Sequence, residues 1–102
     1  MIHVIAIIEL APGTRSVFLA EFHKIVGPVR AEQGCLEYGP AVDAQTGIPQ
    51  QQALGADAVT VVEKWASVAA LQAHLGAPHM LAYRERVKNY VKGVRLHILD
   101  PA

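Results

Sequence analysis

The order of the predicted elements in this chain is typical of an α+β protein with a ferredoxin-like βαββαβ arrangement. Four apolar segments with strand-like alternation are interrupted twice by helical spacing, in the order strand, helix, strand, strand, helix, strand. Such a chain forms a four-stranded antiparallel sheet with its helices on one face. The chain has 102 residues, of which 52 % are apolar, so we expect one domain over residues 1–102 with its own core.

The first strand and the helix after it are predicted from a change of period. Apolar residues fill both sides of the segment Ile2–Leu10, as in a strand that is covered on two faces. The helix that follows begins after Thr14, which can cap it. Its apolar stripe consists of Val17, Phe18, Phe22, Ile25, Val26 and Val29. We expect Gly27 and Pro28 to kink or interrupt this helix near its end.

A second strand and a long loop make up the middle of the chain. A turn at 32–34 leads into a strand predicted over Cys35–Val42. Alternation places three of its residues on one side, namely Leu36, Tyr38 and Val42. Residues 43–57 are polar, carry two glycines and a proline, and show no period. Two interpretations fit a connection of this length: a mobile surface loop, or a functional lid or arm that reaches a partner subunit.

The third strand ends at Trp65 and divides its residues between two sides. One side carries Val59, Val61, Glu63 and Trp65, and the other carries Ala58, Thr60, Val62 and Lys64. Ser67 is the predicted N-cap of an amphipathic helix, which has Val68, Leu71 and Leu75 on one face.

The remaining elements are set by glycine and proline. Gly76 can end the first of two helical pieces, and Pro78 can begin the second. We expect the second piece to continue through 83–91, Gly93 to stop it, and 94–99 to form the last strand.

Composition excludes several classes of function. Nine basic residues balance nine acidic ones, so no basic excess indicates nucleic acid, and no apolar run reaches the roughly 20 residues that span a bilayer. The single cysteine, Cys35, fits a reducing compartment, and we expect a cytoplasmic protein that does not bind membranes.

His74 and His79 are five apart across a Gly-Ala-Pro break, which is not a metal-ligand spacing, so no metal is expected. No glycine-rich nucleotide fingerprint occurs, and only flavin binding without such a fingerprint stays open.

Six residues between the second strand and the second helical piece could carry chemistry: Tyr38, Glu63, Trp65, His74, His79 and Tyr83. Glu63 beside Trp65 on one strand side indicates either a cavity with a polar ligand or solvent, although a tryptophan also fits an ordinary core position. The helix dipole favours a cationic His74 in a last turn and a neutral His79 in a first turn. The alternative is that both histidines simply make hydrogen bonds at helix ends.

Apolar residues on both sides of the strands also predict a partner. With helices on one face only, a set such as Ile5, Ile7, Val59 and Val61 leaves some apolar side chains on the open face. We therefore expect a homodimer formed sheet to sheet around a twofold axis.

Several motifs together resemble the antibiotic-biosynthesis monooxygenase (ABM) family. They span nearly the whole chain, in the family's order: Glu32-Gln33-Gly34-Cys35-Leu36-Glu37-Tyr38, Asp43, Glu63-Lys64-Trp65, Ala70-Leu71-Gln72-Ala73-His74 and Pro78-His79-Met80-Leu81-Ala82-Tyr83. The chain is most similar to the bacterial quinol monooxygenases of this family.

The resemblance implies a homodimeric ferredoxin-like fold, a dimeric α/β barrel, with a pocket between helices and sheet. It also implies oxidation of a quinol or polyphenol by dioxygen without a metal or prosthetic group. In that interpretation His74 or His79 accepts the phenolic proton, and Tyr83 or the other histidine donates to the developing oxyanion. Trp65 would stack on the substrate ring, and Glu63 and Tyr38 would line the pocket.

Proteins that resemble this scaffold also include haem-degrading enzymes and an isomerase, which are two alternatives to quinol oxidation. Haem-degrading relatives have an asparagine on the first strand, which this chain lacks, and here His74 and Arg84 stand near the places of their tryptophan and histidine. An isomerase of a small phosphorylated carbonyl compound would need cations such as Lys64, Arg84 and Arg86 at the phosphate. A dimeric small-molecule-binding protein without turnover also fits the scaffold.

Overall fold

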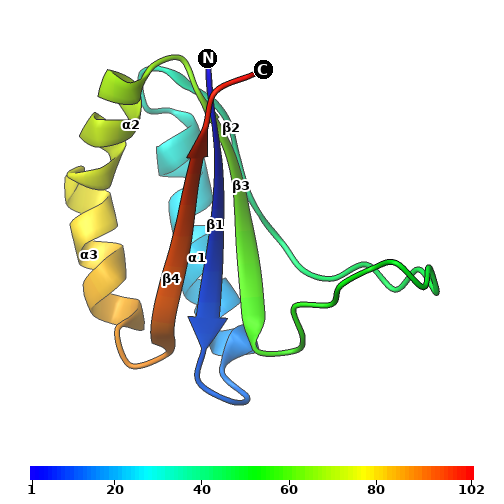
Figure 1. The fold of residues 1–102 in the computed structure, drawn as a ribbon. Coiled ribbons are helices and arrows are strands. Elements are labelled where there is room, and N and C mark those ends of the chain that lie inside the picture. Colours follow the sequence, from blue (N-terminus) through cyan, green and yellow to red (C-terminus); the bar gives the residue numbers. More distant parts are fainter.

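The computed structural model describes all 102 residues and confirms the predicted α+β architecture. The elements are β1 (Ile2–Leu10), α1 (Arg15–Arg30), β2 (Cys35–Ala41), β3 (Ala58–Trp65), α2 (Val68–Leu75), α3 (Pro78–Val87) and β4 (Val91–Leu99). The four strands form one antiparallel sheet in the order β2-β3-β1-β4. All three helices lie on one face of this sheet, and the other face is left open (Figure 1).

The core lies between α1 and the covered face of the sheet. Alternate residues of β1, including Val4, Ala6 and Ile8, are buried there, and the β3 residues opposite them in register lie on the same face. The helix contributes a stripe at helical spacing, made of Phe18, Phe22, Ile25 and Val29. This stripe follows the predicted apolar face, so the period in the sequence identifies the packed side of α1.

The helix α1 runs through Gly27 and Pro28, so the predicted interruption there does not occur. Pro28 has no N–H and leaves the carbonyl of Lys24 without its helical donor. The helix is nearly complete at that point: Ala31 N–H still donates to Gly27 O at 3.1 Å. One missing hydrogen bond near the end of a 16-residue helix is tolerated because the packed stripe holds the helix on the sheet.

The second strand ends at Ala41, and its predicted two-sided pattern is wrong at its beginning. The pairing with β3 shifts between Cys35 and Glu37, which makes Leu36 an extra residue in a β-bulge. Leu36 is therefore 55 % exposed, whereas Tyr38 is buried at 4 %. Val42 lies beyond the strand and is also exposed.

The last helix and strand meet earlier than predicted. α3 ends at Val87, and Tyr90 N–H donates to Val87 O at 2.8 Å in a turn. Ala11 N–H then donates to Tyr90 O at 2.8 Å, which joins this turn to the end of β1. Strand pairing consequently begins at Val91, and Gly93 lies inside β4 instead of stopping a helix.

The segment 43–57 forms an arm that projects from the body of the protein, away from the helices (Figure 1). The Asp43 carboxylate accepts hydrogen bonds from the N–H groups of Leu54 and Gly55, each at 2.9 Å, which closes the base of the arm. These donors also lower the pKa of Asp43. The arm contributes no residue to the cavity between helices and sheet, so it does not act as a lid there in this structure.

The open face of the sheet has an apolar centre. Ile5 and Ile7 of β1 are half-buried, and Val62, paired with Ile5, is 39 % exposed. By contrast, Val59 and Val61 point to the covered face and are buried. None of the three helices combines the length and apolar character needed to cross a bilayer.

Candidate active site

A cavity of about 510 Å³ lies between the helices and the sheet. Twelve of its sixteen lining residues are apolar, which suits a site for an aromatic ligand. The twelve include two buried phenols, Tyr38 of β2 and Tyr83 of α3. The other four lining residues are the buried Glu63 of β3 and His74 of α2, together with Arg84 of α3 and Lys88 just after it. The structure therefore brings together four of the six residues that the sequence singled out.

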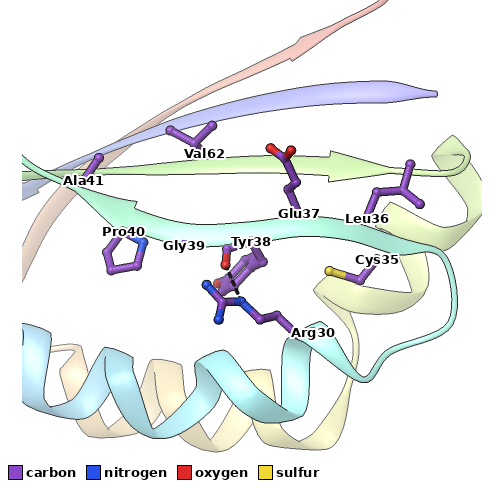
Figure 2. A pocket seen from close by; sticks show the side chains of 9 residues that line it. All are labelled: Arg30, Cys35, Leu36, Glu37, Tyr38, Gly39, Pro40, Ala41 and Val62. Carbon is purple, nitrogen blue, oxygen red and sulfur yellow. Dashed lines mark hydrogen bonds between the residues drawn. The ribbon is translucent and has the colours of Figure 1, made fainter.

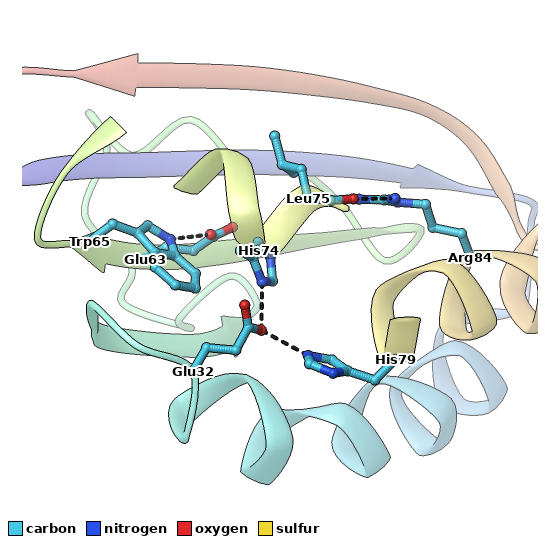
Figure 3. A network of polar contacts seen from close by, with 7 residues as sticks. All are labelled: Glu32, Glu63, Trp65, His74, Leu75, His79 and Arg84. Carbon is cyan, nitrogen blue, oxygen red and sulfur yellow. Dashed lines mark hydrogen bonds and ion pairs between the residues drawn. The ribbon is translucent and has the colours of Figure 1, made fainter. Parts of the chain in front are cut away.

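Glu63 is a buried carboxyl group on the covered face of the sheet. It is 6 % exposed, and Trp65 Nε1 donates a hydrogen bond of 2.9 Å to its Oε1 (Figure 3). Residues two apart in a strand share a face, so β3 itself places this donor beside the acid. Burial raises the pKa of Glu63 to about 7, although the Trp65 hydrogen bond opposes the shift. Glu63 can therefore change protonation state at neutral pH.

His74 is the second buried group, at 2 % exposure. Its Nδ1 is hydrogen-bonded to Oε2 of Glu32 at 2.9 Å (Figure 3), and its ring lies against those of Trp65 and Tyr38, with centroid distances of 4.6 and 5.4 Å. Burial lowers the pKa of His74, while the bond to Glu32 opposes the change. The prediction of a cationic His74, made from the dipole of α2, is therefore wrong in direction. Loss of hydration lowers the pKa of this buried imidazole by more than the end of the helix can raise it.

Glu32 is the residue that sequence reasoning missed as part of the site. It lies in the turn between α1 and β2, and its Oε2 also accepts a hydrogen bond of 2.8 Å from His79 Nε2 (Figure 3). The two histidines are 42 and 47 residues away in the sequence, so no local pattern marks the contact. The only sequence signal is that Glu32 is the first residue of the motif 32–38, on which the resemblance to the ABM family partly rests.

The two tyrosines sit in an aromatic cluster around Phe22. Tyr38 stacks on Phe22 with a centroid distance of 5.5 Å, and Tyr83 meets it edge-on at 5.9 Å. Burial raises the pKa of both phenols, so each remains a neutral hydroxyl at physiological pH. Neutral hydroxyls in an apolar wall can donate hydrogen bonds to a developing oxyanion.

The family is decided by a comparison over most of the chain. Residues 1–86 match the family model described as "Antibiotic biosynthesis monooxygenase". The chain belongs to this family.

Individual proteins are similar to this chain over nearly its whole length. The chain is 43 % identical to the Escherichia coli (strain K12) protein named "Probable quinol monooxygenase YgiN", over 99 % of this chain and 98 % of that protein. The solved structure of Rv0793 from Mycobacterium tuberculosis is 29 % identical, with a TM-score of 0.80 over 99 % of this chain and 94 % of that one. PA3566 from Pseudomonas aeruginosa gives 27 % identity and a TM-score of 0.81, over 99 % and 93 %.

Two residues that the ABM resemblance assigns to the site do not line the cavity. Trp65 is fully buried behind it, where its N–H serves Glu63 and its ring serves His74. His79 is 32 % exposed and is turned toward Glu32. In this geometry Trp65 and His79 support the lining groups and do not face a bound ligand.

A second hollow, of about 530 Å³, follows the outer edge of β2 (Figure 2). Its polar groups already have partners on the protein: Arg30 Nε donates to Tyr38 O at 2.9 Å, and Glu37 pairs with Lys64 at 3.3 Å. No buried acid or base faces it, so the cavity with Glu63 and His74 is the better candidate for catalysis.

The cations that a phosphate would need are dispersed. Lys64 pairs with Glu37, and Arg86 Nε pairs with Glu21 at 2.9 Å. Arg84 Nη1 donates to Leu75 O at 2.7 Å (Figure 3). Arg84 and Lys88 both line the cavity, but Arg84 is engaged with Leu75 O and Lys88 pairs with Glu85. Because these cations already have partners on the protein, the structure favours an apolar ligand over the phosphorylated carbonyl compound of an isomerase. No group of three or more His, Cys, Asp or Glu side chains is arranged to hold a metal ion.

Proposed function

We propose that this protein is a cofactor-independent monooxygenase that oxidises a quinol or polyphenol with dioxygen in the cavity between helices and sheet. The observation that carries the proposal is that a mostly apolar cavity holds two buried ionisable groups. Burial raises the pKa of Glu63 to about 7 and lowers the pKa of His74, which favours a neutral imidazole with a free nitrogen. The similarity to a relative named as a quinol monooxygenase supports the same substrate class.

Deprotonation is the step for which the cavity provides groups. A quinolate is a much better electron donor than a quinol, so removal of a phenolic proton lets the substrate itself reduce dioxygen. His74 accepts this proton on Nε2, because its Nδ1 is engaged with Glu32. Glu63, when ionised, is available for the second hydroxyl.

The overall reaction balances without a further reductant. Quinol and dioxygen give a hydroxyquinone and water: one oxygen atom forms a bond to a ring carbon, and the other leaves as water after the O–O bond breaks. The substrate loses four electrons, and dioxygen gains four. Tyr38 and Tyr83 donate hydrogen bonds to the oxyanion that forms on the ring, and the apolar walls exclude water from the intermediate.

We also propose that the protein works as a homodimer joined through the open face of the sheet. Support comes from the apolar centre at Ile5, Ile7 and Val62, which a twofold partner would cover with its own copy. Polar and charged residues surround this centre and would form the rim: His3, Glu9, Glu37, Lys64, Arg95 and His97. A single half-buried cysteine, Cys35, fits a cytoplasmic location for the enzyme.

Oxygen uptake with a reduced naphthoquinol tests the proposed reaction. We expect oxygen uptake above the uncatalysed rate and quinone formation that stops under anaerobic conditions. Addition of catalase should return no oxygen, because the reaction yields water and not hydrogen peroxide. His23→Gln, an exposed histidine of α1, serves as the control and should keep full activity. Binding of the quinol without any oxygen uptake would contradict the proposal and favour a binding protein without turnover.

A further inference from the structure

One carboxylate links a buried histidine at the cavity to a half-exposed histidine outside it. Glu32 is 14 % exposed, between His74 at 2 % and His79 at 32 %. Both imidazoles bond the same atom, Oε2, at 2.9 and 2.8 Å (Figure 3). The three residues come from the turn before β2, from α2 and from the first turn of α3.

We propose that Glu32 is a positioning residue for catalysis, which holds His74 in the tautomer that presents a bare Nε2 to the cavity. The inference rests on the proposed function, in which His74 is the proton acceptor. An ionised carboxylate only accepts hydrogen bonds, so His74 must carry its proton on Nδ1 to make the contact. The lone pair is then left on Nε2, and His74 is one of the residues that line the cavity.

The surroundings of His74 make Glu32 its principal anionic partner. His79 and Arg84 of α3 both act to lower the pKa of His74, and burial acts in the same direction. Across the cavity stand Glu63 of β3 and the phenols of Tyr38 and Tyr83. Glu32 opposes these effects through a direct hydrogen bond and its charge, so it offsets part of the lowering of the His74 pKa.

His79 acts on this arrangement from the solvent side. A second donor on Oε2 restricts the rotation of the Glu32 carboxylate and fixes the oxygen that faces His74. His79 itself stays outside the cavity. Its effect on catalysis should therefore pass through Glu32 and be smaller than the effect of Glu32.

Glu32→Gln tests the positioning role, since an amide can donate to Nδ1 and so move the proton of His74 to Nε2. We expect kcat to fall by about tenfold or more while KM changes by less than about twofold. Glu85→Gln, an exposed acid on α3, is the matched control and should leave both parameters unchanged. A purely structural link between the turn and the helices would lower thermal stability without this division between kcat and KM.

The ring nitrogens of His74 provide a readout that does not depend on turnover. In ¹⁵N NMR spectra of the wild-type protein we expect a protonated Nδ1 and a bare Nε2 on His74, and loss of this preference in Glu32→Gln. A wild-type His74 protonated on Nε2 would overturn the inference even if the variant failed to fold. If the protein showed no oxygen uptake at all, the tautomer would still decide the role of Glu32, so failure of the proposed function remains distinguishable.

His79→Phe removes the second donor and leaves the first. We expect a smaller loss of kcat than in Glu32→Gln, with His74 still protonated on Nδ1. A loss as large as that caused by His74→Ala would make His79 the base and overturn the proposed arrangement.

Discussion

The two faces of the sheet are built from the same strands but differ in polarity: the covered face holds a polar group among apolar ones, and the open face holds apolar groups among polar ones. The covered face is apolar, with Val4, Ala6 and Val61 buried beneath the helices. The exception on its strands is the carboxyl group of Glu63, and His74 of α2 is the other buried polar group of this layer. The open face carries charged and polar residues around its edge, and its centre is apolar.

The comparison shows how one strand can serve two purposes. Along β3, Glu63 is held in an apolar cavity where its pKa is raised, while its neighbour Val62 is 39 % exposed at the centre of the open face. A polar group in an apolar place is available for chemistry, and an apolar group in a polar place is available for association. Period-two alternation in the sequence encodes both at once.

The largest expected effect concerns the covered face. His74→Ala removes the proposed base, and general-base catalysis typically contributes about 10²-fold to 10⁴-fold, so kcat/KM should fall by about 100-fold or more. Steady-state oxygen uptake with a reduced naphthoquinol measures it. Retention of full activity would remove His74 from the mechanism while leaving the family assignment intact.

On the open face, Val62→Lys places a charge at the apolar centre, which in the proposed homodimer would be buried against the same face of the partner. Burying like charges across an interface costs several kcal/mol, so the dissociation constant of the dimer should rise by about 100-fold or more. Sedimentation at a series of concentrations measures it, with Leu81→Lys, an exposed apolar residue of α3, as the matched control. Equal dimerisation of both variants would show that this face is not the interface.

Glu63→Gln should increase stability above neutral pH while it lowers activity. Burial raises the pKa of Glu63 from 4.5 to about 7, so the folded protein binds this proton more tightly than the unfolded chain does. The contribution of this group to the free energy of unfolding therefore falls between pH 4.5 and 7, by up to about 3 kcal/mol.

Urea denaturation of the wild type and Glu63→Gln at pH 5 and pH 8 measures this contribution. The two proteins should differ little at pH 5, and the variant should be the more stable one at pH 8. A variant that is less stable at pH 8 would mean that the ionised carboxylate is well solvated or paired, contrary to its place in the cavity.

The smallest expected effect concerns the helix that carries His74. Ser67 accepts a hydrogen bond from Ala70 N–H at 3.1 Å at the start of α2. Ser67→Ala should lower the free energy of unfolding by about 1 kcal/mol. Thermal denaturation measures it, and Ser16→Ala, an exposed change in the first turn of α1, should have a smaller effect. Equal effects of the two changes would show that the cap does not hold α2 in place.

The sequence predicts most of the fold because its signals are local. The N-cap at Ser67, the stop at Gly76 and the start at Pro78 are found where the pattern places them. The bulge at Leu36 was not predicted, because one extra residue in a strand depends on pairing with a partner far away in the chain.

The candidate site was predicted only in part, for a related reason. Residues such as Glu63 and His74 could be chosen because a polar group among apolar ones is visible in the sequence. The role of Glu32 depends on contacts across more than 40 residues, and the direction of the pKa shift of His74 depends on burial by the whole fold. Neither the role of Glu32 nor the pKa shift of His74 leaves a pattern in the neighbouring sequence.

Turnover of a reduced naphthoquinol under ¹⁸O₂, followed by mass spectrometry of the product, tests the central claim most directly. The account predicts a hydroxyquinone that carries one ¹⁸O atom, formed by the wild type and by His23→Gln but at least about 100-fold more slowly by His74→Ala. An unlabelled quinone formed at the same rate by all three proteins would contradict it.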